Sequence, residues 1–301
     1  MRQEFLYFRL LSAHTKHRSE QIIVRIAILS FLLHLLLIFF VDFHWVDLPD
    51  PSRLLSDPIT AIYTPFSFIL VYEVYLVVYY LPKSITTYIG KQYEIITLII
   101  IRRIFKDISN LELTGDWFSV KYNIQFTFDI LATIILFFLI LVFYRLNKQR
   151  ENWQKPSLPP TSAMEKFIRR KKLIAILLVP IFLLLAVFVF GRWVYESFFS
   201  IDQIVDSLRN VNNIFFNEFF TILILTDVLL LLTSFFHTDQ FSTVIRNSGF
   251  LISTILIRLS FGAEGWLNVT LIIVAVLFGV LILAIHNQYE KLDQSTTKEE
   301  S

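Results

Sequence analysis

The sequence predicts an all-α fold, a polytopic bundle of about eight transmembrane helices. Hydrophobic residues make up 55% of the 301 residues and charged residues only 17%, whereas soluble domains are about 25% charged. Thirty-one phenylalanines among so few charged residues leave too little polar surface to cover a soluble globule. Apolar runs of roughly 20 residues, long enough to cross a bilayer as a helix, recur along the whole chain. These observations predict an integral membrane protein.

The first apolar run, 22–41, is longer than the apolar region of a signal peptide and has no small-residue cleavage site, so it predicts a signal-anchor helix. Further runs predict the other spans: 59–81, 85–103, 122–144, 173–194, 213–235, 241–260 and 266–286. The runs at 85–103 and 241–260 are the weakest, because each has a charged residue near its start. A chain of six or seven spans is the alternative.

Basic residues decide the expected topology. The N-terminal segment contains Arg2, Arg9, Lys16 and Arg18, and the stretch 145–172 is the most basic part of the chain. Such residues are enriched on the cytoplasmic side of membrane proteins, so both segments are expected there, with an even number of crossings between them. The weak third run therefore has to cross. The same count places both chain termini in the cytoplasm, and the plasma (inner) membrane is the expected location.

The two halves of the chain resemble one another. The tripeptide AIL at 27–29 recurs at 175–177, and GDWFSV at 115–120 has a counterpart in EGWLNV at 264–269. Four spans in each half give the two copies the same orientation, a parallel repeat. A chance similarity of two apolar sequences is the alternative. The predicted organisation is a first four-span repeat at 1–144, a basic cytoplasmic linker at 145–172, a second repeat at 173–286 and a cytoplasmic tail at 287–301.

Five ionisable residues of the first repeat form the predicted transport path: His34, Glu73, Lys91, Glu94 and Asp129. Ionisable groups inside a membrane are costly and commonly line a route for ions or substrates. A helix rise of about 1.5 Å per residue places Glu73 and Lys91 at the same depth. The alternative is a set of buried ion pairs that fix helix register and, for His34, a hydrogen bond to a neighbouring helix.

The second repeat carries fewer charges within its predicted spans. Asp227 and Arg246 occupy depths similar to those of the acid and base in the first repeat. The stretches 173–190 and 267–284 contain no charged residue. The first repeat is therefore expected to hold the polar interior, and the second to be mainly structural.

Three arginines lie near the outer ends of their predicted spans: Arg102, Arg103 and Arg258. Long basic side chains at that depth reach towards lipid headgroups, so these residues are expected to be interfacial anchors. Asp129 lies at a similar depth, within reach of Arg102 or Arg103.

The expected function is that of an integral membrane transport protein, either a channel or a proton- or cation-linked transporter. The chain has no cysteine and no HExxH, GxSxG or phosphate-binding glycine motif, so neither catalytic residues nor a metal or cofactor are expected. A net charge of +2 gives no bulk attraction to nucleic acid. The alternative is a non-catalytic scaffold or subunit that binds another membrane protein. Besides the lipid bilayer, a membrane-protein partner or a homo-oligomer is expected.

Overall fold

The computed structural model describes residues 2–43, 45, 58–108, 111, 115–153, 162–199, 204–235, 241–263 and 265–299. Within these ranges the chain is helical and contains no β-strand. The α-helices are α1 (Arg2–Leu11), α2 (Ala13–Asp42), α3 (Tyr63–Tyr80), α4 (Ile85–Asp107), α5 (Lys121–Trp153), α6 (Ser162–Phe199), α7 (Ile204–Phe235), α8 (Phe241–Ser260) and α9 (Trp266–Glu299). Short 3-10 segments, Pro58–Ile62 and Trp117–Ser119, precede α3 and α5. The middle of the expected linker, 154–161, lies outside the described residues.

Every apolar run of the sequence forms a helix at the expected place. Three helical segments are long and apolar enough to cross a membrane by length and composition: Glu4–Asp42, Lys121–Gln149 and Trp266–Leu292. The helices extend beyond the apolar runs at several ends, because polar residues continue the helical hydrogen bonding. The all-helical fold class is confirmed, and these three helices agree with a membrane protein.

Local sequence explains two of the helix boundaries. Ser12 separates α1 from α2, because its Oγ accepts a hydrogen bond from the Thr15 amide at 3.1 Å and so caps the start of α2. Gly265 lies in the turn before α9 with a φ of 62°, a conformation that residues with a Cβ rarely adopt. The turn lets α8 and α9 pack side by side as an antiparallel pair.

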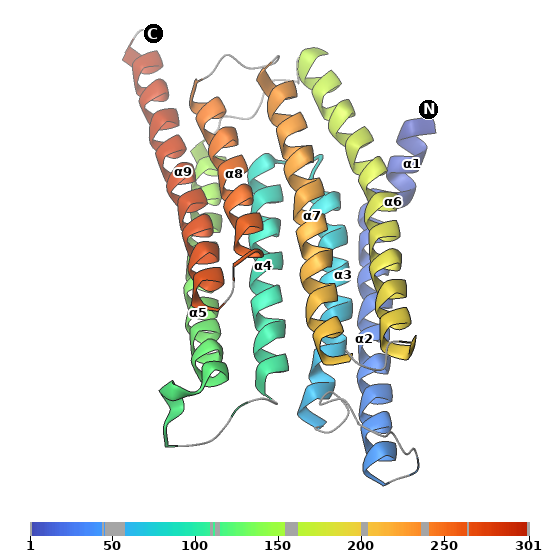
Figure 1. Ribbon diagram of the computed structural model, residues 1–301. Coiled ribbons are helices and arrows are strands. Elements are labelled where there is room, and N and C mark those ends of the chain that lie inside the picture. The colour runs from blue at the N-terminus through green and yellow to red at the C-terminus, as the bar shows by residue number, and fades with distance from the viewer. Residues whose placement is uncertain are drawn as a thin grey trace.

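The helices form two rows (Figure 1). One row contains α2, α3, α4 and α5, and the other contains α6, α7, α8 and α9 in the same order across the view. Contacts between the rows join α5 to α9, α4 to α8 and α3 to α6. Helix α1 begins and α9 ends at the same end of the bundle, which we call the terminal end.

Side chains pack closely between the rows, where α4, α5, α8 and α9 meet. The buried aromatic rings of Tyr93 and Phe250 pack against that of Phe143. The Tyr93 hydroxyl lies 2.8 Å from Ser253 Oγ, which donates to a backbone carbonyl of α9. Gly279 faces this hydroxyl so closely that a Cβ would overlap it. Small residues therefore let the two rows approach here.

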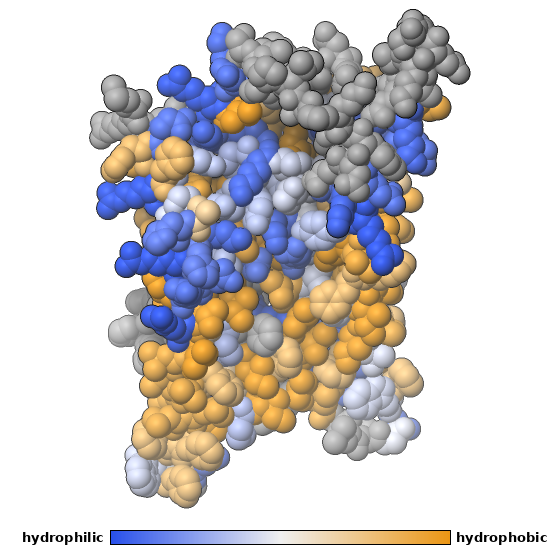
Figure 2. Space-filling view, turned by 180° about the vertical axis from the view of Figure 1, so that it is seen from behind, coloured by the Kyte–Doolittle hydropathy of each residue, from blue (hydrophilic) through white to orange (hydrophobic). Residues whose placement is uncertain are grey.

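Apolar side chains cover much of the outer surface (Figure 2). Hydrophilic side chains gather towards the terminal end, and apolar ones dominate the rest of this face. Helix α2 contributes a row of exposed aliphatic side chains: Ile28, Leu29, Leu32, Leu33, Leu36 and Leu37. A continuous apolar surface of this size is unfavourable in water and suits hydrocarbon.

Candidate functional site

The central polar cluster of the first row lies on α4, on the side that faces α3 and α5. Lys91 donates to Glu94 Oε2 at 2.5 Å. Tyr144 of α5 donates to the other carboxylate oxygen, Oε1, also at 2.5 Å. Lys91 and Glu94 are three residues apart on one helix, so their side chains project from the same face. Both are half-buried, which leaves the pair partly accessible from outside.

Glu73 of α3 borders this cluster, and the structure leaves its carboxylate incompletely bonded. Its Oε2 is buried and has no hydrogen-bond partner among the described residues. The charged groups that act on it are Lys91 and Glu94, then Glu20 and Lys16 of α2. The ion pair between Glu73 and Lys91, which belongs to the alternative reading of these charges, does not form among the described residues, because Lys91 binds the acid on its own helix.

Lysine side chains surround the end of α3 next to this cluster. The ammonium groups of Lys16, Lys83 and Lys91 lie 5.7, 4.9 and 5.4 Å from the centroid of the Tyr80 ring. Lys16 also lies 3.5 Å from the Tyr80 hydroxyl. Cations at such distances are attracted to the ring face. Tyr80 thus separates the Lys91–Glu94 pair from the lysines nearer the terminal end.

Asp129 of α5 is enclosed in an ion pair. Arg103 Nε and Nη2 donate to its two carboxylate oxygens at 2.6 and 2.5 Å, and Gln125 Nε2 donates to Oδ1 at 2.9 Å. Arg103 also donates to Asn268 Oδ1 of α9 at 2.9 Å. The Asp129 side chain is 0% exposed. This arrangement joins α4, α5 and α9 and leaves Asp129 sealed from solvent.

His34 lies apart from the cluster. Its Nδ1 is 2.5 Å from Thr64 Oγ1, at the start of α3. Nine residues separate Thr64 from Glu73, about 13–14 Å along the helix. The same spacing separates Glu94 from Arg103 and its partner Asp129. The structure therefore brings together Glu73, Lys91 and Glu94 of the predicted path, and places His34 and Asp129 towards the opposite end of the bundle.

In the second row, Asp227 and Arg246 bind different residues. Asp227 Oδ2 accepts from Gln92 Nε2 of α4 at 3.4 Å, and Gln92 Oε1 accepts from Thr254 Oγ1 at 2.9 Å. Arg246 donates to Asn247 Oδ1 at 3.1 and 3.0 Å and lies 3.2 Å from His286 Nε2. Asp227 and Arg246, which were expected at similar depths, therefore do not form an ion pair with each other.

The three predicted anchors all lie against protein groups. Arg102 is 6% exposed, Arg103 holds Asp129, and Arg258 donates to Thr221 Oγ1 of α7 at 2.9 Å. Their proposed contact with lipid headgroups stays a prediction.

Lys171 is a buried cation that sequence reasoning missed. It lies at the polar start of α6 and donates to the Lys83 carbonyl at 3.0 Å, which ties α6 to the turn between α3 and α4. Burial lowers the pKa of the Lys171 ammonium to about 8, and the positive charge of Arg246 adds to that effect. In the sequence it is one of many basic residues of the linker, so no local signal distinguishes it.

Gln92, Tyr88 and Tyr144 were also missed. They are uncharged, and uncharged polar residues in a helix carry no sign of their partners. Gln92 and Tyr88 are four residues apart and share a face of α4, which is directed at α7 and α8.

No family model, curated protein or solved structure matches the chain.

Proposed function

We propose that the chain is an integral membrane transport protein that binds a proton or a monovalent cation at Glu73. In this proposal all eight apolar helices cross the membrane, and the terminal end faces the cytoplasm of the plasma (inner) membrane. Three observations support this topology: the helix positions, the apolar outer surface and the common end at which the chain begins and ends (Figures 1 and 2). The basic segments at that end support the cytoplasmic assignment.

The observation that carries the proposal is the unpaired oxygen of Glu73. A buried carboxylate oxygen without a hydrogen-bond partner is costly. In addition, the group around Glu73 contains three carboxylates, those of Glu73, Glu94 and Glu20, against the ammonium groups of Lys91 and Lys16. Lys91 is already bonded to Glu94, so among the described residues no cation bonds the negatively charged Glu73 carboxylate. A bound proton or small cation would neutralise it, and reversible binding of this kind is the basis of ion-coupled transport.

The proposed path differs from the expected one at its far end. Glu73, Lys91 and Glu94, with Tyr144, form the binding position. Asp129 serves instead in a structural ion pair with Arg103, since its two oxygens are fully bonded. His34 is bonded to Thr64 at that same end. The route between the Glu73 position and that end is not part of the proposal.

We also propose that the two halves of the chain are a parallel repeat that arose by duplication. Two rows with the same helix order and the same direction of each corresponding helix are what a parallel repeat would produce (Figure 1). The pairs α4–α8 and α5–α9 join helices in corresponding positions of the two halves.

Flux measurements on purified protein in liposomes test the transport proposal. An imposed proton gradient would be followed with a pH-sensitive dye trapped inside, and an imposed sodium gradient with a sodium-sensitive dye. Wild-type protein should dissipate one of the two gradients faster than empty liposomes. Glu73→Gln should remove most of that flux while the helix content measured by circular dichroism stays the same.

Glu4→Gln is the matched control, because Glu4 is an exposed acid that pairs with Lys172 at 3.3 Å outside the cluster. Its flux should equal that of the wild type. Equal flux in the wild type and in folded Glu73→Gln would contradict the proposal, as would the absence of any flux for both ions.

A second candidate function, a scaffold for another membrane protein, is favoured by α2. Within the helical segment Glu4–Asp42, only 11% of the apolar stretch is buried inside the protein. Helix α2 therefore exposes most of its apolar side chains. A second membrane protein could pack there in place of lipid. The chain has no cysteine of its own, so cross-linking from single cysteines placed at Leu29 and Leu33 would identify such a partner. The scaffold role also requires that the protein in liposomes shows no flux.

A further inference from the structure

Two lysine ammonium groups lie against the same pair of tyrosine rings at the terminal end of the bundle. Lys83 is in the turn between α3 and α4, and its Nζ is 4.0 Å from the centroid of the Tyr79 ring and 4.9 Å from that of Tyr80. Lys16 Nζ of α2 is 5.6 and 5.7 Å from the same two centroids. Tyr79 is only 6% exposed, so its packed ring gives both cations a fixed base.

These two cations are not paired with acids. Neither ammonium group lies within ion-pair distance of a carboxylate in the described part of the chain. Lys16 acts electrostatically on Glu73, but from beyond that distance. Lys83 is exposed and Lys16 is half-buried. Because a lysine side chain is flexible, ammonium groups in such positions can reach an anion outside the protein.

The Tyr80 hydroxyl adds a further donor beside the two lysines. Its oxygen lies 3.5 Å from Lys16 Nζ, and no described residue accepts its proton. A phosphate group carries its negative charge on oxygens that only accept hydrogen bonds, so ammonium and hydroxyl donors suit it. Lysine is a common phosphate-binding residue.

We infer that Lys16, Lys83 and the Tyr80 hydroxyl form a binding site for the headgroup phosphate of an anionic lipid. Hydrophilic side chains gather towards this end of the bundle, and apolar ones dominate the rest of the surface (Figure 2). Farther along α2, Ile22 and Ile26 are exposed, and such side chains offer apolar surface to the acyl chains. The combination of donors at the polar end and apolar surface below it favours a lipid over a soluble phosphate compound.

The inference rests on the proposed topology, in which the terminal end faces the cytoplasm, and not on ion binding at Glu73. Anionic lipids of the cytoplasmic leaflet attract basic residues that lie directly beside a membrane span. Lys83 is in such a position, between the apolar runs 59–81 and 85–103. A lipid bound there would also contact Lys16, and would hold the start of α2 against the turn between α3 and α4.

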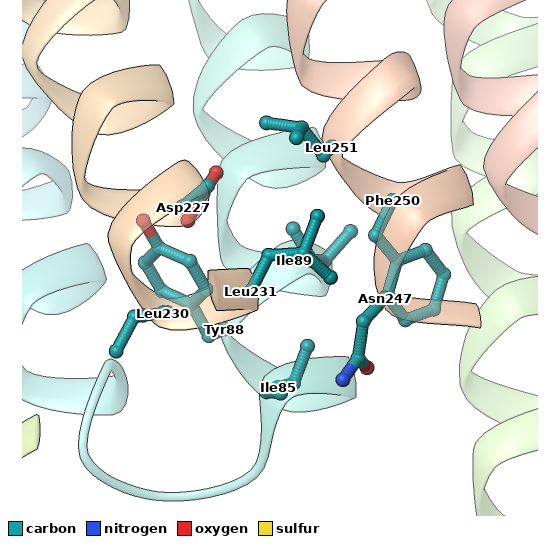
Figure 3. Close-up of a pocket in the computed structure, with 9 residues that line it drawn as sticks. All are labelled: Ile85, Tyr88, Ile89, Asp227, Leu230, Leu231, Asn247, Phe250 and Leu251. Atoms are coloured by element: carbon teal, nitrogen blue, oxygen red, sulfur yellow. The ribbon is translucent and has the colours of Figure 1, made fainter. Parts of the chain in front are cut away.

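The cavity between α4, α7 and α8 is not an alternative place for this ligand (Figure 3). Its volume is about 20 Å³, and its lining is mostly aliphatic or aromatic, with three polar exceptions: Tyr88, Asp227 and Asn247. The Asp227 carboxylate accepts hydrogen bonds from Tyr88 and Gln92. A space of this size holds roughly one water molecule, and a carboxylate in its wall would repel a phosphate.

Titration of the purified protein with phosphatidylglycerol in a neutral detergent, followed by native mass spectrometry, tests the site. The wild type should bind this anionic lipid more tightly than phosphatidylcholine, whose headgroup has no net charge. The double variant Lys16→Gln, Lys83→Gln should bind phosphatidylglycerol more weakly, by about fivefold for each lysine removed. The matched control is Lys121→Gln with Lys148→Gln, which removes the same charge from two exposed lysines of α5. The control should bind as the wild type does.

Equal affinities of the wild type and the Lys16, Lys83 double variant would overturn the inference, as would an equal loss in the control or equal binding of phosphatidylcholine. Inorganic phosphate that binds as tightly as the lipid would assign the site to a soluble phosphate instead. Lys83 is exposed in a turn, so Lys83→Gln alone should fold and show its fivefold loss. Without that loss the inference fails, even if the double variant does not fold. Flux at Glu73 is measured separately, in liposomes of phosphatidylcholine alone, so either proposal can fail without the other.

Discussion

The ion pair between Arg103 and Asp129 gives the most direct stability prediction. Replacing Asp129 by asparagine keeps the shape of the side chain but removes its charge and places an amide donor opposite the Arg103 donors. The variant then keeps at most one of the two hydrogen bonds from Arg103, of 2.6 and 2.5 Å, and leaves the guanidinium without its counter-ion. Asp129→Asn should therefore destabilise the bundle where α4, α5 and α9 meet.

The magnitude follows from burial. Removing one partner of a fully buried ion pair costs roughly 3–5 kcal/mol. Asp129 is 0% exposed but Arg103 is 30% exposed, so part of the stranded charge can be solvated. We therefore expect a loss of about 2–3 kcal/mol in the free energy of unfolding, at or below the lower end of that range.

The assay is unfolding in mixed micelles with increasing sodium dodecyl sulfate, followed by circular dichroism. Lys172→Gln is the control, since its partner Glu4 is 49% exposed, and exposed pairs contribute about 0–1 kcal/mol. A double-mutant cycle with Arg103→Gln should give a coupling energy of at least about 1 kcal/mol. A coupling energy near zero, or an Asp129→Asn loss as small as that of the control, would show that the pair does not stabilise the fold.

Two other predictions concern packing and pH. Gly279→Ala should destabilise the protein by about 1–3 kcal/mol, the usual cost of overpacking, because its Cβ would overlap the Tyr93 hydroxyl. Gly115→Ala, with no atom within 4 Å of the added Cβ, is the control, and equal stability of the two variants would contradict the close approach. The Lys171 pKa is lowered from 10.5 to about 8 in the folded protein, so between these values the unfolded chain binds more protons. Stability should therefore rise with pH across that window. Lys171→Gln should show a smaller rise in the same denaturation series, and an identical slope would count against the buried ammonium.

The positions of the helices followed directly from the sequence. Each apolar run became a helix, and the two weak runs, with charges near their starts, are α4 and α8. This success has a local cause, because a long apolar segment satisfies its backbone hydrogen bonds within itself whatever its neighbours are. The depth of Glu73, Lys91 and Glu94 could be counted in the same way, from a constant rise per residue.

The partners of these residues depended on the packing of the helices. Equal depth along the helix axes left ion pairs of Glu73 with Lys91 and of Asp227 with Arg246 as the alternative to a transport path. In the structure Lys91 binds Glu94 on its own helix, and Asp227 binds Gln92 from the other half of the chain. Such choices depend on how each helix is rotated and which helices lie beside it, and neither quantity is contained in the pattern of one segment. The cavity at Tyr88 has the same origin, since three separate helices form its walls.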